Sequence, residues 1–78
     1  MAFIRSFSEA DRDAAPDRTD VDAEWARVHT SGGVLLKIST FGSDDRVSGR
    51  KPSQVVTIDR ERARELVQII KSTFGTLD

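Results

Sequence analysis

The chain contains no cysteine and no tyrosine, and its aromatic residues are limited to four phenylalanines and one tryptophan among 78 residues. The absence of cysteine excludes disulfide bonds, thiolate metal sites and cysteine nucleophiles, and it is typical of proteins from a reducing compartment. No run approaches the ~20 apolar residues of a membrane span, and the N-terminus lacks a basic region followed by an apolar block. We therefore expect a cytoplasmic protein that is neither exported nor inserted into a membrane.

Few side chains are suited to catalysis. His29 is the only histidine, and it lies in an alternating segment beside an arginine, where histidine is usually a surface or interface residue. Asp44 and Asp45 lie in a Gly-Ser-Asp-Asp turn that lacks the ligand spacing of a calcium loop. An enzyme needs a nucleophile, a base and an orienting group, or a set of metal ligands. The sequence therefore predicts no enzymatic activity, no metal site and no cofactor.

Acidic and basic residues are unevenly distributed along the chain. Residues 1–25 carry three basic and seven acidic side chains, whereas residues 26–78 carry nine basic and six acidic ones. The stretch 8–22 is almost free of large apolar residues, so we expect residues 1–23 to form a disordered acidic arm and residues 24–78 to form the domain. This segregation predicts either an arm that competes with an anionic partner of the domain or a solubilising tail.

A small apolar island precedes the acidic stretch. It consists of Phe3, Ile4 and Phe7, and the two phenylalanines share one side if the segment is extended. Three interpretations are open: an accessory edge strand, a docking segment for a partner, or a frayed terminus.

The domain begins with a pattern of strands. Residues 24–30 alternate with period two, and the turn Ser31-Gly32-Gly33 leads into a strand of branched and aromatic residues over 34–41. A polar stretch follows, in which a short irregular strand is expected around 46–48. The last strand is expected over 54–58, with Val56 and Ile58 on one side and Val55 and Thr57 on the other.

The pattern then changes to helical spacing. Apolar residues recur at i, i+3, i+4 and i+7 within 60–74, with Asp59 suited to the N-cap and Gly75 suited to the position after the helix. The order of elements predicts an α+β fold, with an antiparallel sheet of about four strands followed by one C-terminal helix. A chain of this length buries only about 60% of its surface, so oligomerisation would stabilise it.

Three arginines stand at the start of this helix, where the helix dipole disfavours cations. They are Arg60, Arg62 and Arg64. Two interpretations are open: ion pairs with Glu61 and Glu65, or an extension of an anion-binding surface.

One helix covers only one face of the sheet. We predict that it packs on the side of Val28, Leu36, Ile38, Val56 and Ile58. The opposite face would then display Trp25, Arg27, His29, Leu35, Lys37 and Phe41. Aromatic rings interleaved with cations fit single-stranded nucleic acid, since bases stack on the rings and the cations neutralise phosphates. The alternative is that these rings are buried in a dimer interface or under the N-terminal island.

The segment from Trp25 onward resembles the positive cofactor four family of transcriptional coactivators and its bacterial relatives. The similarity lies in the turn Gly32-Gly33, the strand 34–38, the loop Gly49-Arg50-Lys51-Pro52 and the helix opened by Asp59. The resemblance covers roughly two thirds of the chain. It implies a curved four-stranded sheet with a helix, a homodimer formed partly through the helices, and binding of single-stranded DNA in a transcription-related role.

The resemblance also assigns roles to individual residues. It implies that Lys37, Arg50 and Lys51 contact phosphates and that Trp25 and Phe41 stack on bases. The complete predicted nucleic-acid-binding set is Trp25, Arg27, Lys37, Phe41, Arg46, Arg50 and Lys51.

The sequence therefore leaves two functions open. The first is a small homodimeric protein that grips single-stranded DNA or RNA through the helix-free sheet face and the Arg50-Lys51 loop. The alternative is a protein-protein interaction module or regulatory adaptor that uses the same face to dock a protein partner.

Overall fold

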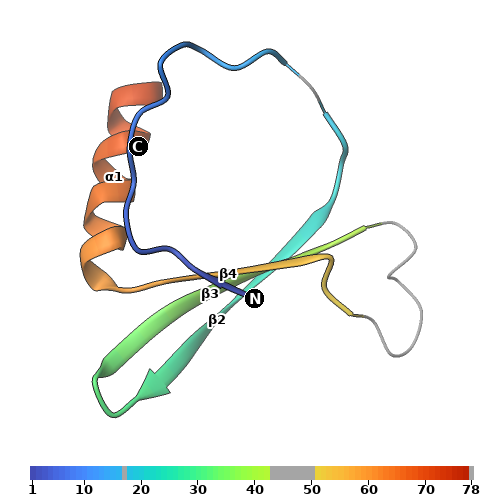
Figure 1. Ribbon diagram of the computed structural model, residues 1–78, viewed down its shortest axis with the longest axis vertical. Coiled ribbons are helices and arrows are strands. Elements are labelled where there is room, and N and C mark those ends of the chain that lie inside the picture. Colours follow the sequence, from blue (N-terminus) through green and yellow to red (C-terminus); the bar gives the residue numbers. More distant parts are fainter. Residues whose placement is uncertain (17, 43–50, 78) are drawn as a thin grey trace.

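The computed structural model describes residues 1–16, 18–42 and 51–77. Its elements are β1 (Ala2–Phe3), β2 (Asp22–Thr30), β3 (Gly33–Phe41), β4 (Gln54–Ile58) and α1 (Arg60–Phe74), as Figure 1 shows. The predicted α+β fold, four strands followed by one C-terminal helix, is confirmed. The short strand expected at 46–48 lies outside the described residues.

The sheet is mixed rather than wholly antiparallel. Its strand order is β1-β4-β3-β2, and β1 runs parallel to β4 while the other two pairs are antiparallel. The predicted antiparallel sheet is therefore wrong at one edge, because the first strand comes from the N-terminal island. Of the three interpretations of that island, the structure shows the accessory edge strand. The chain then crosses from one edge of the sheet to the other before β2 begins.

Helix α1 has the bounds that its sequence pattern predicts. The Asp59 carboxylate accepts a hydrogen bond from the backbone N–H of Arg62 at 2.8 Å, which satisfies one of the free donors of the first turn. At the other end Gly75 adopts a φ of +80° and donates its N–H to the carbonyl of Lys71 at 2.8 Å. The left-handed conformation favours glycine at this position, so the cap explains why the helix ends here.

The buried core is small. Among the described hydrophobic residues, only Ile58 (2% exposed) and Phe41 (7% exposed) are buried, and α1 buries none of its side chains. The radius of gyration is 14.7 Å, against about 11.5 Å for a compact chain of this length. The fold therefore leaves apolar surface open on both the sheet and the helix.

The segment that follows β1 runs along α1 (Figure 1). We call residues 4–9 the N-terminal strap. Ile4 donates its N–H to the carbonyl of Thr57 at 2.9 Å, and Arg62 Nη1 donates to the carbonyl oxygen of Arg5 at 2.5 Å. Farther along, Phe7 lines an apolar hollow together with Leu66, Ile69 and neighbouring residues of α1. The strap therefore covers one side of the helix and ties it to the sheet edge.

Arg62 is the polar anchor of the strap. Besides its bond to Arg5 it forms an ion pair with Glu65 at 2.5 Å, and its side chain is only partly exposed. We expect Arg62→Ala to lower the free energy of unfolding by about 1–2 kcal/mol, since hydrogen bonds to a charged group are lost. It should also speed amide exchange in the strap.

Urea unfolding and hydrogen exchange measure the two effects. Arg64→Ala is the matched control, because Arg64 is exposed and forms no ion pair among the described residues. Its unfolding free energy should change by less than about 0.5 kcal/mol. Equal effects of the two substitutions would contradict the anchoring role.

Candidate nucleic-acid interface

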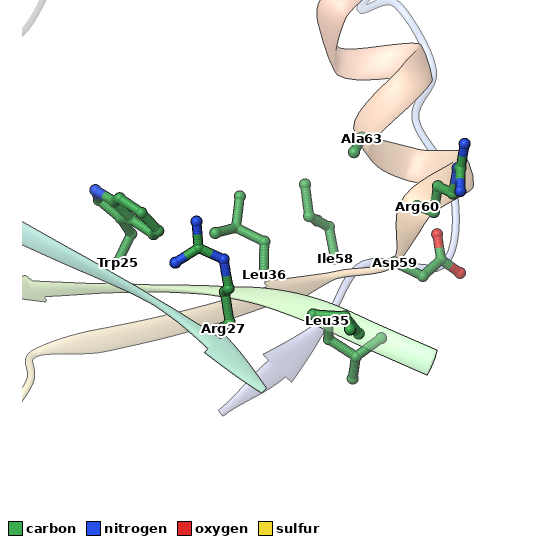
Figure 2. A pocket seen from close by; sticks show the side chains of 9 residues that line it. Trp25, Arg27, Leu35, Leu36, Ile58, Asp59, Arg60 and Ala63 are labelled. Atoms are coloured by element: carbon green, nitrogen blue, oxygen red, sulfur yellow. The ribbon is translucent and has the colours of Figure 1, made fainter. Parts of the chain in front are cut away.

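The register of the sheet decides which side chains share a face. In antiparallel pairs, residues directly opposite each other project to the same side. Trp25 is opposite Ile38, and Arg27 is opposite Leu36, which is in turn opposite Ile58. We call the face shared by these five residues the helix-side face, because α1 lies on that side of the sheet in Figure 2.

The predicted division of the faces is wrong for β2, because Trp25, Arg27 and His29, expected on the face opposite the helix, lie on the helix-side face. Lys37 is opposite Ala26, and Phe41 is opposite Asp22, so both lie on the other face from Trp25 and Arg27. The same holds for Leu35, whereas His29 stays with Trp25. Val28, expected under the helix, also lies on the other face because it is opposite Leu35.

The predicted faces were wrong because of the length of the turn between β2 and β3. The expected turn had three residues, Ser31 to Gly33, which would place odd-numbered residues of the two strands opposite one another. In the structure Gly33 is instead the first residue of β3 and is opposite Thr30, so only two residues form the turn. A slip of one residue moves every side chain of a strand to the opposite face.

An open pocket forms where the helix-side face meets the start of α1 (Figure 2). In this view Trp25, Arg27, Leu36 and Ile58 project toward the side of the helix, while Leu35 points away. The pocket wall is completed by other residues of β3 and by the helix start, including Asp59, Arg60 and Ala63. Apolar side chains thus form the floor and cations stand beside it.

Trp25 is the most prominent aromatic side chain of this face. It is 61% exposed, although its ring is large and apolar. The guanidinium carbon of Arg27 lies 5.1 Å from the centroid of the ring, which is the geometry of a cation–π contact. The i, i+2 spacing on β2 brings these two side chains to the same side. The pair therefore presents an aromatic surface and a positive charge in one place.

A second hollow extends this surface along the sheet. It is lined by Ala23, Glu24, Trp25, Leu36 and Ile38. Trp25 and Leu36 line both hollows, so the two hollows adjoin on this face. The helix-side face therefore offers a continuous apolar track rather than one enclosed cavity.

The three arginines of the first helical turns divide by role. Arg62 pairs with Glu65 at 2.5 Å and with Glu61 at 3.4 Å, which confirms the ion-pair interpretation for this residue. Arg60 is exposed, lines the pocket and has no acidic partner within the described residues. Asp59 is also in the pocket, but its carboxylate is engaged by the backbone of α1. Arg64 is also exposed and has no ion pair among the described residues, but it does not line the pocket, so Arg60 is the one of the three that is available to a ligand there.

The structure brings together only part of the predicted set. Trp25 and Arg27 share the pocket, Lys37 is half-buried on the other face, and Phe41 is buried, so its ring has little surface for a base. Lys51 is exposed before β4, and Arg46 and Arg50 lie outside the described residues. Arg60 was not in the predicted set, although the arginine cluster at the helix start left open that it extends an anion-binding surface.

Within residues 1–16, 18–42 and 51–77, no helix combines the length and the apolar character of a membrane span. No group of three or more histidine, aspartate or glutamate side chains gathers there in a way that could hold a metal ion.

Comparison with protein-family models, with curated proteins and with solved structures found no match to this chain. The resemblance to the positive cofactor four family therefore remains a prediction.

Proposed function

We propose that this protein binds single-stranded nucleic acid on its helix-side face, with Trp25 stacking on a base and Arg27 and Arg60 contacting phosphates. The observation that carries the proposal is a largely exposed tryptophan in an open pocket with two arginines. Stacking on an aromatic ring stabilises an unpaired base of any sequence, and arginines neutralise the backbone. The resemblance to a single-stranded DNA-binding family supports the same chemistry and a role in transcription.

The apolar track favours a single strand over a duplex. The two hollows are lined mainly by carbon atoms of Trp25, Leu36, Ile38 and their neighbours. In a duplex the faces of the bases are stacked on each other and only their edges are reachable, whereas unpaired bases can lie flat on such a surface. Contacts of this kind discriminate little between bases, so we propose binding that is nearly independent of the base sequence.

The first test is a titration of a labelled single-stranded oligonucleotide, followed by fluorescence anisotropy at low and moderate salt, with the matched duplex as control. We expect binding that favours the single strand and weakens as salt rises. Absence of binding at low salt would contradict the proposal.

Charge-neutralising variants then test the phosphate contacts. We expect Arg27→Gln and Arg60→Gln each to flatten the dependence of log K on log salt by about 0.7, the slope of one phosphate contact on a single strand. The double variant should lose about twice that slope, because the two residues lie on different elements and act separately. Anisotropy titrations at several salt concentrations measure the slope.

Arg18→Gln is the matched control for these variants. Arg18 is exposed in the acidic arm and donates to Asp20 at 2.6 Å, and it lines neither hollow of the helix-side face. The salt slope should remain that of the unmodified protein. A double variant of Arg27 and Arg60 with an unchanged slope would refute the phosphate contacts.

The second candidate function is a protein-interaction module, and the apolar lining of the same face favours it. Val34, Leu36 and Ile38 stand beside Trp25 on the helix-side face without a described element that buries them. Docking of a protein partner there would depend on Trp25 and would change little with salt. Salt dependence therefore separates the two candidates.

A further inference from the structure

Strand β2 forms an open edge of the sheet. It is the last strand in the order, and among the described residues its backbone pairs with β3 alone. In a hairpin with a two-residue turn, the two residues that flank the turn exchange both backbone hydrogen bonds. Farther along the two strands, pairs that are hydrogen-bonded in this way alternate with pairs that are not. Since Thr30 and Gly33 flank the turn, the even-numbered residues of β2 bond to β3. The N–H and C=O groups of Ala23, Trp25, Arg27 and His29 therefore point toward the open edge.

This edge carries three charged side chains, Asp22, Glu24 and Arg27, but it lacks the backbone features that normally protect one. Natural proteins shorten edge strands, interrupt them with proline or bend them with bulges, because a row of free backbone groups pairs readily with another strand. Strand β2 contains no proline, and its register runs without a break from Asp22 to Thr30. The edge is therefore competent to accept a further strand.

We propose that a second copy of this chain occupies the edge, with the two β2 strands antiparallel across a two-fold axis at Ala26. Ala26 is the midpoint of β2, so this register overlaps the two strands over their whole length. Each residue whose backbone groups point toward the open edge is then opposite another such residue. Trp25 is opposite Arg27 of the second copy, and Ala23 is opposite His29 of the second copy. The sheets of the two copies become one.

Neighbouring registers fit less well. An axis at Arg27 would place two guanidinium groups directly opposite each other, which is destabilising. An axis at Trp25 would pair His29 with Val21, which lies before the strand. With the axis at Ala26, the closest pair has small side chains, and each guanidinium faces an indole ring of the other copy. Charge and size therefore select this register.

The joined sheet would enlarge the nucleic-acid surface, and this step rests on the proposed function. Opposite residues of paired strands project to the same side. Trp25 and Arg27 of both copies would therefore gather at the centre of one continuous face, and a single strand could cross the axis and stack on both rings. This surface differs from the helix-mediated dimer that the family resemblance implies.

A single introduced cysteine tests the register, because the chain has no cysteine of its own. In a pair without backbone hydrogen bonds the two Cα atoms lie about 4.5 Å apart, which is within the range of a disulfide. We expect Ala26→Cys to form a covalent dimer of twice the 8.7 kDa chain mass under mild oxidation. Non-reducing electrophoresis and mass spectrometry detect it.

Val28→Cys is the matched control. Val28 lies two residues along the same side of β2, but in this register it is opposite Glu24 of the second copy. The two introduced thiols would then be about 13 Å apart, too far for a disulfide. We therefore expect no cross-link. Light scattering of the unmodified protein should give the mass of a dimer.

Three results would overturn the proposal. One is equal cross-linking of the two variants, which indicates random collision. Another is an unmodified protein that is a dimer while Ala26→Cys does not cross-link, which places the interface elsewhere, for example on the exposed Val67 and Phe74 of α1. The third is a monomer at every concentration tested.

Oligonucleotide titrations of oxidised and reduced Ala26→Cys separate this proposal from the proposed function. A monomer that binds the single strand would leave the proposed function standing and overturn the edge pairing. A cross-linked dimer that does not bind the strand would support the edge pairing and contradict the proposed function.

Discussion

Trp25→Ala is expected to weaken binding of a single-stranded oligonucleotide by about 5- to 150-fold. Stacking of one base on an aromatic ring is worth about 1–3 kcal/mol, and each 1.4 kcal/mol changes the dissociation constant about tenfold. The fold should tolerate the change, because the Trp25 side chain is mostly exposed and buries little apolar surface. Trp25→Phe should retain part of the affinity, since it keeps a smaller ring.

The measurement is an anisotropy titration, supported by the intrinsic fluorescence of the unmodified protein. Trp25 is the only tryptophan, so quenching on addition of oligonucleotide reports stacking at this residue. Phe74→Ala is the matched control, because Phe74 is 71% exposed and ends α1 without lining either hollow of the helix-side face. Affinity that survives Trp25→Ala, or falls equally in the control, would remove Trp25 from the site.

Ile58→Ala is expected to lower the free energy of unfolding by about 2–5 kcal/mol, the usual range for removing most of a buried isoleucine. Ile58 is the least exposed hydrophobic residue described, and it is opposite Leu36 beneath the start of α1. Small domains are stable by only about 5–15 kcal/mol, so this substitution removes a large share of the total. Ile58→Val should cost about 0.5–1.5 kcal/mol.

Urea denaturation followed by circular dichroism measures these changes. Ile69→Ala deletes the same atoms from a residue of α1 that is 42% exposed, and we expect it to cost about 1 kcal/mol or less. If the two alanine variants lose equal stability, the core does not centre on Ile58.

The sequence pattern was sufficient for the elements whose signals are local. The helix was predicted from its apolar spacing and from Asp59 and Gly75, each of which acts within one helical turn. Strand β4 was predicted from its branched residues. Strand β1 was only one of three interpretations, because two residues cannot establish a period and its partner lies more than fifty positions away.

The candidate site was predicted only in part, and the reason is one residue of the turn. Composition identified Trp25 and Arg27 as a pair that could bind nucleic acid, and both lie in the pocket. The prediction that Trp25 and Arg27 share a face with Lys37 and Phe41 was wrong. Gly33 belongs to β3 and not to the turn, and this shift of one residue moves the side chains of β2 to the opposite face of the sheet. Glycine fits both a turn and a strand end, so the pattern could not decide between them.

The parallel pairing of β1 with β4 has a consequence for the order in which the chain acquires its structure. A ribosome releases β1 before the strand it binds and before the helix that holds the strap. The β2–β3 hairpin closes only a short loop and can form early, whereas β1 must wait for a partner strand more than fifty positions later in the chain. During that interval β1 and the apolar residues of the strap remain exposed to chaperones and to other nascent chains.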